Sequence, residues 1–188
     1  MKPTDILKEE HHGVKLALKV LGRINERIAG TPGNLDAAYV SDYAKLLDFF
    51  RVFVDKCHHA KEEEVLFPAL LESGLPREGG PVQVMLAEHD AGRKLVAEMS
   101  AALADYRAGT PGAVTALAAA AQGYTQLLVD HIAKEDDILY PLADAGIPQP
   151  VQDGMIEAFE GIEADRIGPG THEQFHAMLK EFRAAYLG

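Results

Sequence analysis

The chain has 188 residues, a formal net charge of −11 and 25% charged residues, which is the composition of an ordinary globular protein with a sizeable core. Nucleic-acid binding depends on clustered lysines and arginines, so the acidic balance argues against that partner. No stretch approaches the roughly 18 apolar residues of a membrane span, and the N-terminus lacks the apolar segment of a signal peptide. The single cysteine, Cys57, excludes an internal disulfide framework and is typical of a reducing cytoplasm, where we expect the protein.

The first expected helix covers residues 4–29. Apolar residues recur in it at spacings of three and four, and His11 lies on the same stripe. His12 is rotated from that stripe by roughly 100°. A turn cluster at 30–34, rich in glycine and proline, ends the helix.

The second expected helix begins near Asp36 and carries two competing stripes. One stripe includes His58, Glu62 and Val65, and the other includes His59, Glu63, Leu66 and Leu70. The residues alone do not decide which histidine and glutamate face inward. Pro68 predicts a kink near Glu64, because proline removes a backbone hydrogen bond from the helix.

Histidines also interrupt the apolar stripes of the third and fourth expected helices. The third helix follows Pro81, and Gly92 leaves space one turn after His89. The stripe of the fourth helix includes Leu128, His131, Glu135, Ile138 and Leu142.

Four helices of about 25–35 residues, joined by short loops, predict an all-α protein with an antiparallel up-down four-helix bundle over residues 1–148. Residues 149–188 predict two additional short helices packed on the outside or end of the bundle. They contain His172 and His176, which we interpret as surface or dimer contacts. The sharper hypothesis is that this pair caps the site or forms a second cation site. A homodimer is a further hypothesis.

A repeat links the second and fourth helices. The segment C-H-H-A-K-E-E-E-V-L-F-P at 57–68 corresponds, position for position, to D-H-I-A-K-E-D-D-I-L-Y-P at 130–141. In both, a glutamate follows a histidine by four residues, which places the two side chains on one face of a helix. Imidazole and carboxylate are costly to bury unpaired, and a shared metal ion is the most economical reason for burying them twice.

Each of these residues also has a plainer interpretation. A single histidine on an apolar stripe is more often a hydrogen-bonded core residue than a ligand, and Cys57, Tyr124 and Tyr140 are expected in the core. Histidines on all four stripes, together with the repeat, favour a metal site. Histidine with carboxylate suits iron, manganese or zinc, and two carboxylates that can bridge suggest two ions.

The pattern resembles the hemerythrin-like, or HHE cation-binding, family. The resemblance rests on E-E-H-H-G-V-K-L-A-L at 9–18, A-E-H-D at 87–90 and the two repeat segments, and it covers roughly residues 5–146. It implies a four-helix bundle around a non-haem, usually di-iron centre. The metal ligands implied by the resemblance are His11, His58, Glu62, His89, His131 and Glu135. The substitutes that a shifted register allows are His12, His59, Glu63 and Asp136.

One position departs from the family pattern. Oxygen-carrying hemerythrins have a second histidine four residues after the one on the third helix, where this chain has Arg93. This departure makes oxygen transport unexpected and predicts one ion that is less fully ligated, or completed by water or another carboxylate. An incompletely ligated ion is open to O₂, NO, peroxide or water. We therefore expect a non-haem iron protein that binds or reacts with a small ligand, in sensing, metal handling or stress response. The residues expected to form apolar walls around its centre are Leu18, Phe50, Val96, Leu128 and Ile138.

Two other functions compete with this hypothesis. A ferritin-like iron oxidase or store uses Glu-x-x-His, which occurs at Glu9 with His12 and at Glu173 with His176. That hypothesis leaves the repeat unexplained. A metal-free helical interaction module, with acidic faces for a basic partner, predicts that no metal is retained and that His58→Leu or His131→Leu is neutral or stabilising. The residues do not decide whether the protein is an enzyme.

Overall fold

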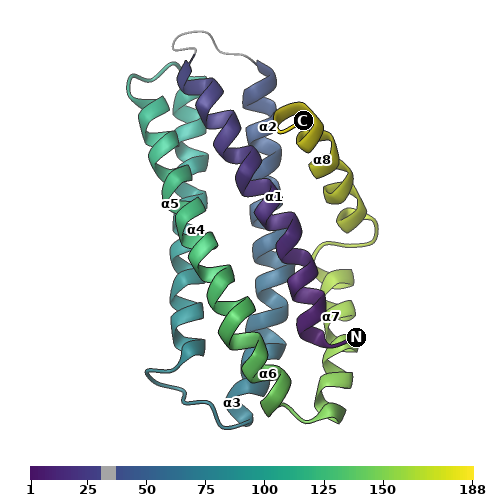
Figure 1. The fold of residues 1–188 in the computed structure, drawn as a ribbon. Helices are drawn as coiled ribbons and strands as arrows, with labels where there is room; N and C mark the ends of the chain where they lie inside the picture. Colours follow the sequence, from purple (N-terminus) through teal and green to yellow (C-terminus); the bar gives the residue numbers. More distant parts are fainter. Residues whose placement is uncertain (31–36) are drawn as a thin grey trace.

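The computed structural model describes residues 1–30 and 37–188, and all regular secondary structure in these ranges is helical. Four long helical stretches lie side by side, and two shorter helices flank them (Figure 1). The predicted all-α bundle is confirmed. The predicted turn at 31–34 and the predicted helix start at Asp36 lie outside the described residues.

The first stretch is α1 (Pro3–Gly30), and the third is α4 (Pro81–Arg107). The second stretch consists of α2 (Ala37–Asp48), the π-helical segments η1 (Phe49–His59) and η2 (Glu62–Leu66), and α3 (Phe67–Glu72). The fourth consists of α5 (Ala113–Lys134), the π-helical segment η3 (Glu135–Leu139) and α6 (Tyr140–Gly146).

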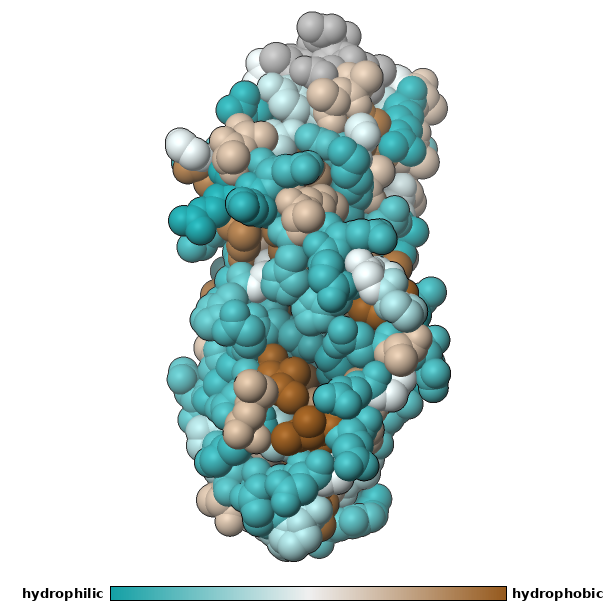
Figure 2. Space-filling model, turned by 90° about the vertical axis from the view of Figure 1, so that its right-hand side faces the viewer, coloured by the Kyte–Doolittle hydropathy of each residue, from teal (hydrophilic) through white to brown (hydrophobic). Residues whose placement is uncertain are grey.

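The C-terminal helices are α7 (Gln149–Arg166) and α8 (Thr171–Tyr186). Both pack against α1 and against the π-helical part of the second stretch. The face that they form is mainly hydrophilic, with an apolar patch in its lower half (Figure 2). The domain boundary expected at residue 148 stays a prediction. None of the described helices is long and apolar enough to cross a membrane.

Both prolines of the repeat follow a π-helical turn. The N–H of Phe67, directly before Pro68, donates to the carbonyl of Glu62, and the N–H of Tyr140 donates to the carbonyl of Glu135. Each bond spans five residues instead of four, which adds one residue to the turn. The irregularity predicted near Glu64 therefore takes the form of a widened turn.

The widened turns change which face of the helix is buried. Glu135 is buried at the start of the π-helical segment, and Leu139 and Tyr140 are buried at its end, whereas Ile138 and Leu142 are 55% and 42% exposed. The expectation that Ile138 and Leu142 face the core is wrong, because the extra residue moves the buried face by one position. In the second stretch the buried face likewise passes from the stripe of Glu62 to that of Leu66 and Leu70.

The apolar core is divided into two clusters with a polar layer between them. On α1, Leu7 belongs to one cluster and Val14 to the other. On the second stretch the clusters are separated between Val54 and Leu66. The buried histidines and glutamates of the bundle lie in these gaps. Of the other residues expected to form apolar walls, all are buried: Leu18, Phe50, Val96 and Leu128.

Candidate metal centre

Four histidines, one from each helical stretch, meet in this polar layer. The Nε2 atoms of His11 and His58 are 3.1 Å apart, and those of His89 and His131 are 3.2 Å apart. All four side chains are almost completely buried. The Nε2 atoms of the four rings therefore face one another across the bundle.

Two glutamates lie between the two histidine pairs. One oxygen of Glu135 is 3.2 Å from His11 Nε2, and the other is 3.0 Å from His131 Nε2. Glu62 Oε2 is 3.8 Å from His58 Nε2 and 3.4 Å from His89 Nε2. All six residues expected from the sequence are thus brought together, and each carboxylate faces both pairs.

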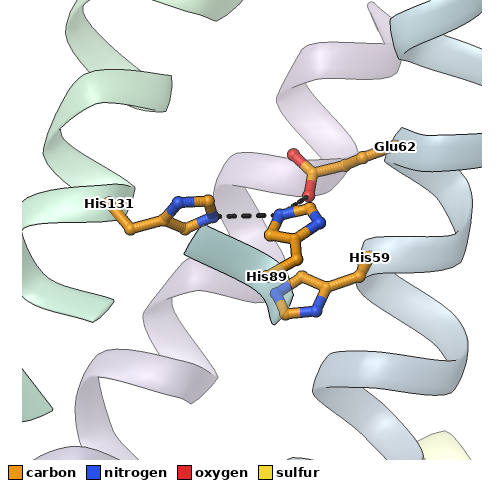
Figure 3. Close-up of side chains that lie close together, drawn as sticks. All are labelled: His59, Glu62, His89 and His131. Atoms are coloured by element: carbon orange, nitrogen blue, oxygen red, sulfur yellow. Dashed lines mark hydrogen bonds and ion pairs between the residues drawn. The ribbon is translucent and has the colours of Figure 1, made fainter. Parts of the chain in front are cut away.

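The candidate ligand atoms of this centre form two groups, and the atoms of each group lie within 4.8 Å of one another. One consists of His59, Glu62, His89 and His131 (Figure 3), and the other of His11, His58 and Glu135. Both oxygens of Glu135 and Oε2 of Glu62 are buried and accept no hydrogen bond. Leaving such oxygens unsatisfied is costly, and nitrogen and oxygen donors in this arrangement suit a pair of borderline metal ions. The residues present fit a dinuclear centre.

Every histidine of the two pairs is hydrogen-bonded to an outer carboxylate through its second nitrogen, Nδ1. The four bonds are His11 to Asp136 at 2.8 Å, His58 to Glu10 at 2.7 Å, His89 to Glu63 at 2.7 Å and His131 to Glu88 at 2.9 Å. A proton held on Nδ1 leaves Nε2 of the neutral ring free as a metal donor. Glu63 and Asp136, which the sequence allowed as substitute ligands, therefore occupy the outer layer.

Sequence reasoning missed the roles of Glu10 and Glu88. Each directly precedes a histidine of the centre, but each bonds the histidine of the neighbouring stretch. The repeated Glu-His dipeptide at 10–11 and 88–89 was the available signal. The lysines of the repeat complete the layer, because Lys61 contacts Glu10 and Lys134 contacts Glu88.

The surrounding carboxylates change the proton affinity of the histidines. Burial lowers the pKa of His11, but the hydrogen bond to Asp136 and the nearby negative charges of Glu135 and Glu62 outweigh it and raise the pKa to about 9. Burial likewise opposes the effect of Glu62 and Glu63 on His89, whose pKa also rises to about 9. Protons on these rings balance the carboxylates when no metal is bound.

His59 is a fifth buried histidine at the centre. Its ring stacks on that of His89, with 3.8 Å between the ring centroids, and its Nδ1 is 3.4 Å from Asp55. Burial and then the neighbouring His89 lower the pKa of His59 to about 3, so the ring is neutral. His12 instead has a 71% exposed side chain and pairs with Glu9. Among the substitute histidines, the structure brings His59 and not His12 to the centre.

Tyr140 and Arg93 also take part in the site. The hydroxyl of Tyr140, expected to be only a core residue, donates to Glu62 Oε1 at 2.8 Å. Arg93 pairs with Asp55 and Glu63, each at 2.7 Å. Arg93 therefore supports the carboxylates that contact His59 and His89, at the position where oxygen-carrying relatives have a ligand.

A pocket of about 350 Å³ reaches His59 from the surface between η1 and α4. The residues that form its apolar lining include Phe50, Gly92, Val96 and Tyr124, and Arg93 and Asp55 lie on its wall. A small molecule can approach the His59 side of the centre through this pocket.

A buried histidine and carboxylate cluster inside a helical bundle defines a non-haem metal-binding protein. The family of hemerythrin HHE cation-binding domains matches residues 2–143, and the chain belongs to this family. Domains of this family bind non-haem iron, and the two ligand groups fit a di-iron site.

The chain is similar to proteins named iron-sulfur cluster repair protein YtfE. It is 35% identical over 92 residues to those of Escherichia coli (strain K12 / DH10B) and Shigella boydii serotype 18 (strain CDC 3083-94 / BS512). The matched segment is 47% of this chain and 41% of the relative in both cases, so the chain spans about two fifths of the length of these relatives. No solved structure matches the chain significantly.

Proposed function

We propose that the chain is a di-iron protein whose centre binds or reacts with O₂, NO or peroxide. His11 and His58 would hold one ion, and His89 and His131 the other, with Glu62 and Glu135 shared. The observation that carries this proposal is the convergence of two Nε2 pairs on carboxylate oxygens without hydrogen bonds. Iron, when bound, supplies a coordination position for a small ligand.

His59 is the proposed additional ligand on the side of His89. It belongs to the same group of candidate ligand atoms and reaches the pocket. This histidine would take the place of the one that Arg93 replaces on α4. The outer carboxylates hold the rings in place, and the apolar lining of the pocket favours a neutral diatomic molecule over a hydrated ion.

Repair of iron-sulfur clusters, the role in the name of the YtfE relatives, is the more specific hypothesis. An iron centre that binds a small ligand such as NO is suited to a response to damage of metal centres. Sensing and metal handling are compatible with the same geometry. Residence in the cytoplasm and a homodimer stay predictions, as does zinc or manganese as the metal.

The test is iron content and NO binding of the protein reconstituted without air. We expect about two irons per chain, following from the two ligand groups, and a visible spectrum that changes when NO is added. His58→Leu and His131→Leu should each lower the iron content, and His12→Leu should not. Absence of iron after anaerobic reconstitution would overturn the proposal.

The ferritin-like alternative is not favoured by the geometry. Glu9, His12, Glu173 and His176 are exposed, in contrast to the buried residues of the centre. Glu173→Ala should therefore leave the iron content unchanged, whereas an oxidase centre built on Glu173 and His176 would lose iron.

A further inference from the structure

The two halves of the repeat contain the same chain of contacts behind their histidines. In one half, Lys61 contacts Oε1 of Glu10, and Oε2 of Glu10 accepts a hydrogen bond from His58. In the other, Lys134 contacts Oε1 of Glu88, and Oε2 of Glu88 accepts a hydrogen bond from His131. Histidine, glutamate and lysine thus follow one another outward from each half of the centre.

The lysines of the two halves have different surroundings. The side chain of Lys134 is 36% exposed, so water solvates its ammonium group, whereas that of Lys61 is only 2% exposed. The C-terminal helices cover Lys61. Its Nζ donates to Oε2 of Glu163 on α7 at 3.0 Å, and Oε1 of Glu163 accepts a hydrogen bond from His172 Nδ1 on α8 at 3.0 Å.

His172 is held by aromatic packing. Its ring lies edge-on to Phe53 of η1, with 5.1 Å between ring centroids, and stacks on His176 at 4.7 Å. A continuous chain of four polar contacts therefore connects α8 to His58: His172 to Glu163, Glu163 to Lys61, Lys61 to Glu10, and Glu10 to His58.

Lys61 also explains a third cluster of candidate ligand atoms, formed by Glu10, Cys57 and Glu163. The ammonium group of Lys61 contacts both carboxylates. A cation thus already lies between them, and a metal ion is not needed to balance their charge.

A buried ammonium group depends on the protein for compensation, because water cannot reach it. Lys61 shares its charge between Glu10 and Glu163. Without Glu163, the charge of Lys61 would act on Glu10 alone and would compete with His58 for that carboxylate. The position of the His58 ring therefore depends on a residue of α7.

We propose that α7 and α8 stabilise the metal ion held by His58, with Glu163 and His172 as positioning residues that act through Lys61 and Glu10. The inference rests on the ligand assignment under Proposed function. Residues 149–188 lie outside the range that matches the family, so this support is added to the family domain by the C-terminal helices. The ion on the side of His131 has no such support, since Lys134 is solvated.

The test compares the two irons of Glu163→Gln with those of the unchanged protein, both loaded with ⁵⁷Fe and challenged with a chelator. We expect one of the two irons to leave about 3- to 10-fold faster, a smaller effect than the 10- to 100-fold typical of a direct partner of a ligand. In the Mössbauer spectrum of Glu163→Gln, the doublet of one iron should differ from that of the unchanged protein, and the doublet of the other iron should be the same. Glu160→Gln, a matched change at an exposed position one turn earlier on α7, should change neither.

A double variant tests whether Glu163 acts through Lys61. Adding Glu163→Gln to Lys61→Met should increase the release rate no further. If Lys61→Met does not fold, Glu163→Gln alone decides. Release of both irons at the unchanged rate, or equal acceleration of both, would overturn the inference. Failure of the unchanged protein to bind iron would overturn the proposed function instead.

Discussion

Glu10 precedes His11 in the sequence, yet its carboxylate accepts a hydrogen bond from His58 on the neighbouring helical stretch, at 2.7 Å. Glu88 and His131 repeat this relationship between the third and fourth stretches. In each Glu-His dipeptide, the histidine is thus a candidate metal ligand, and the glutamate accepts a hydrogen bond from the histidine of the neighbouring helical stretch. The metal centre and the packing of the bundle are built by the same contacts.

Removal of the outer carboxylates should have unequal effects. Glu10→Gln breaks the buried ion pair between Lys61 and Glu10 and leaves Lys61 with only the partly exposed Glu163. Breaking a buried ion pair costs about 3–5 kcal/mol. We expect Glu10→Gln to lower iron affinity by about 10- to 100-fold and to lower the free energy of unfolding clearly. Iron titration and urea denaturation measure the two effects.

Glu88→Gln is the matched control for stability. Its partner Lys134 is partly solvated, so this variant should lose iron affinity with a smaller loss of stability. Equal destabilisation by both variants would show that the burial of Lys61 has no energetic consequence.

The stability of the iron-free protein should depend on pH. The pKa values of His11 and His89 rise from 6.5 to about 9 on folding. Their stabilising effect is therefore complete below pH 6.5 and is lost as pH rises through about 9. We expect the Tm of the iron-free protein to fall over this range, and scanning calorimetry at several pH values measures it.

The iron-loaded protein should not follow that trend, because metal binding displaces the protons from the ring nitrogens. The difference in Tm between loaded and iron-free protein should widen from pH 6.5 to 9. An iron-free Tm that stays constant or rises across this range would contradict the assigned proton affinities.

Each of His12 and His59 directly follows an expected ligand, and replacing them one at a time should distinguish the exposed histidine from the buried one. His59→Ala removes a buried candidate ligand that is stacked on His89, and we expect loss of iron affinity together with a changed visible spectrum. His12→Ala removes an exposed ring and should leave iron content and spectrum unchanged. If His59→Ala retains two irons with an unaltered spectrum, His59 is a packing residue only.

Gly92 provides a test of the pocket. A β-carbon at this position would lie 3.6 Å from Tyr124 and 3.8 Å from Leu127, which is ordinary van der Waals contact. Gly92→Ala should therefore fold and stabilise α4 by up to about 1 kcal/mol, through helix propensity. Gly92→Leu should narrow the pocket and slow NO binding several-fold at full iron content.

Stopped-flow mixing with NO measures the rate, and Gly22→Leu serves as the control at a helix position with open space around it. An unchanged NO rate in Gly92→Leu would mean that the ligand reaches the centre by another path.

The sequence by itself determined the helical class and brought out four stripes that each carry a histidine. Periodicity within a helix shows which residues share a face, and the repeat shows that two of those faces carry the same chemistry. All six residues that the family resemblance implied as ligands meet in one buried layer.

Only the tertiary structure decided between His12 and His59, assigned Glu10 to His58, and turned Ile138 toward solvent. The burial of His59 and the exposure of Ile138 depend on π-helical segments, which change the number of residues per turn and so move the buried face away from the regular pattern. His12 lies on the regular helix α1. The assignment of Glu10 to His58 depends on contacts between helices, which the spacing of residues within one helix does not encode. For the same reason, the link from His172 to the centre is absent from the sequence pattern and arises only when α7 and α8 pack over Lys61.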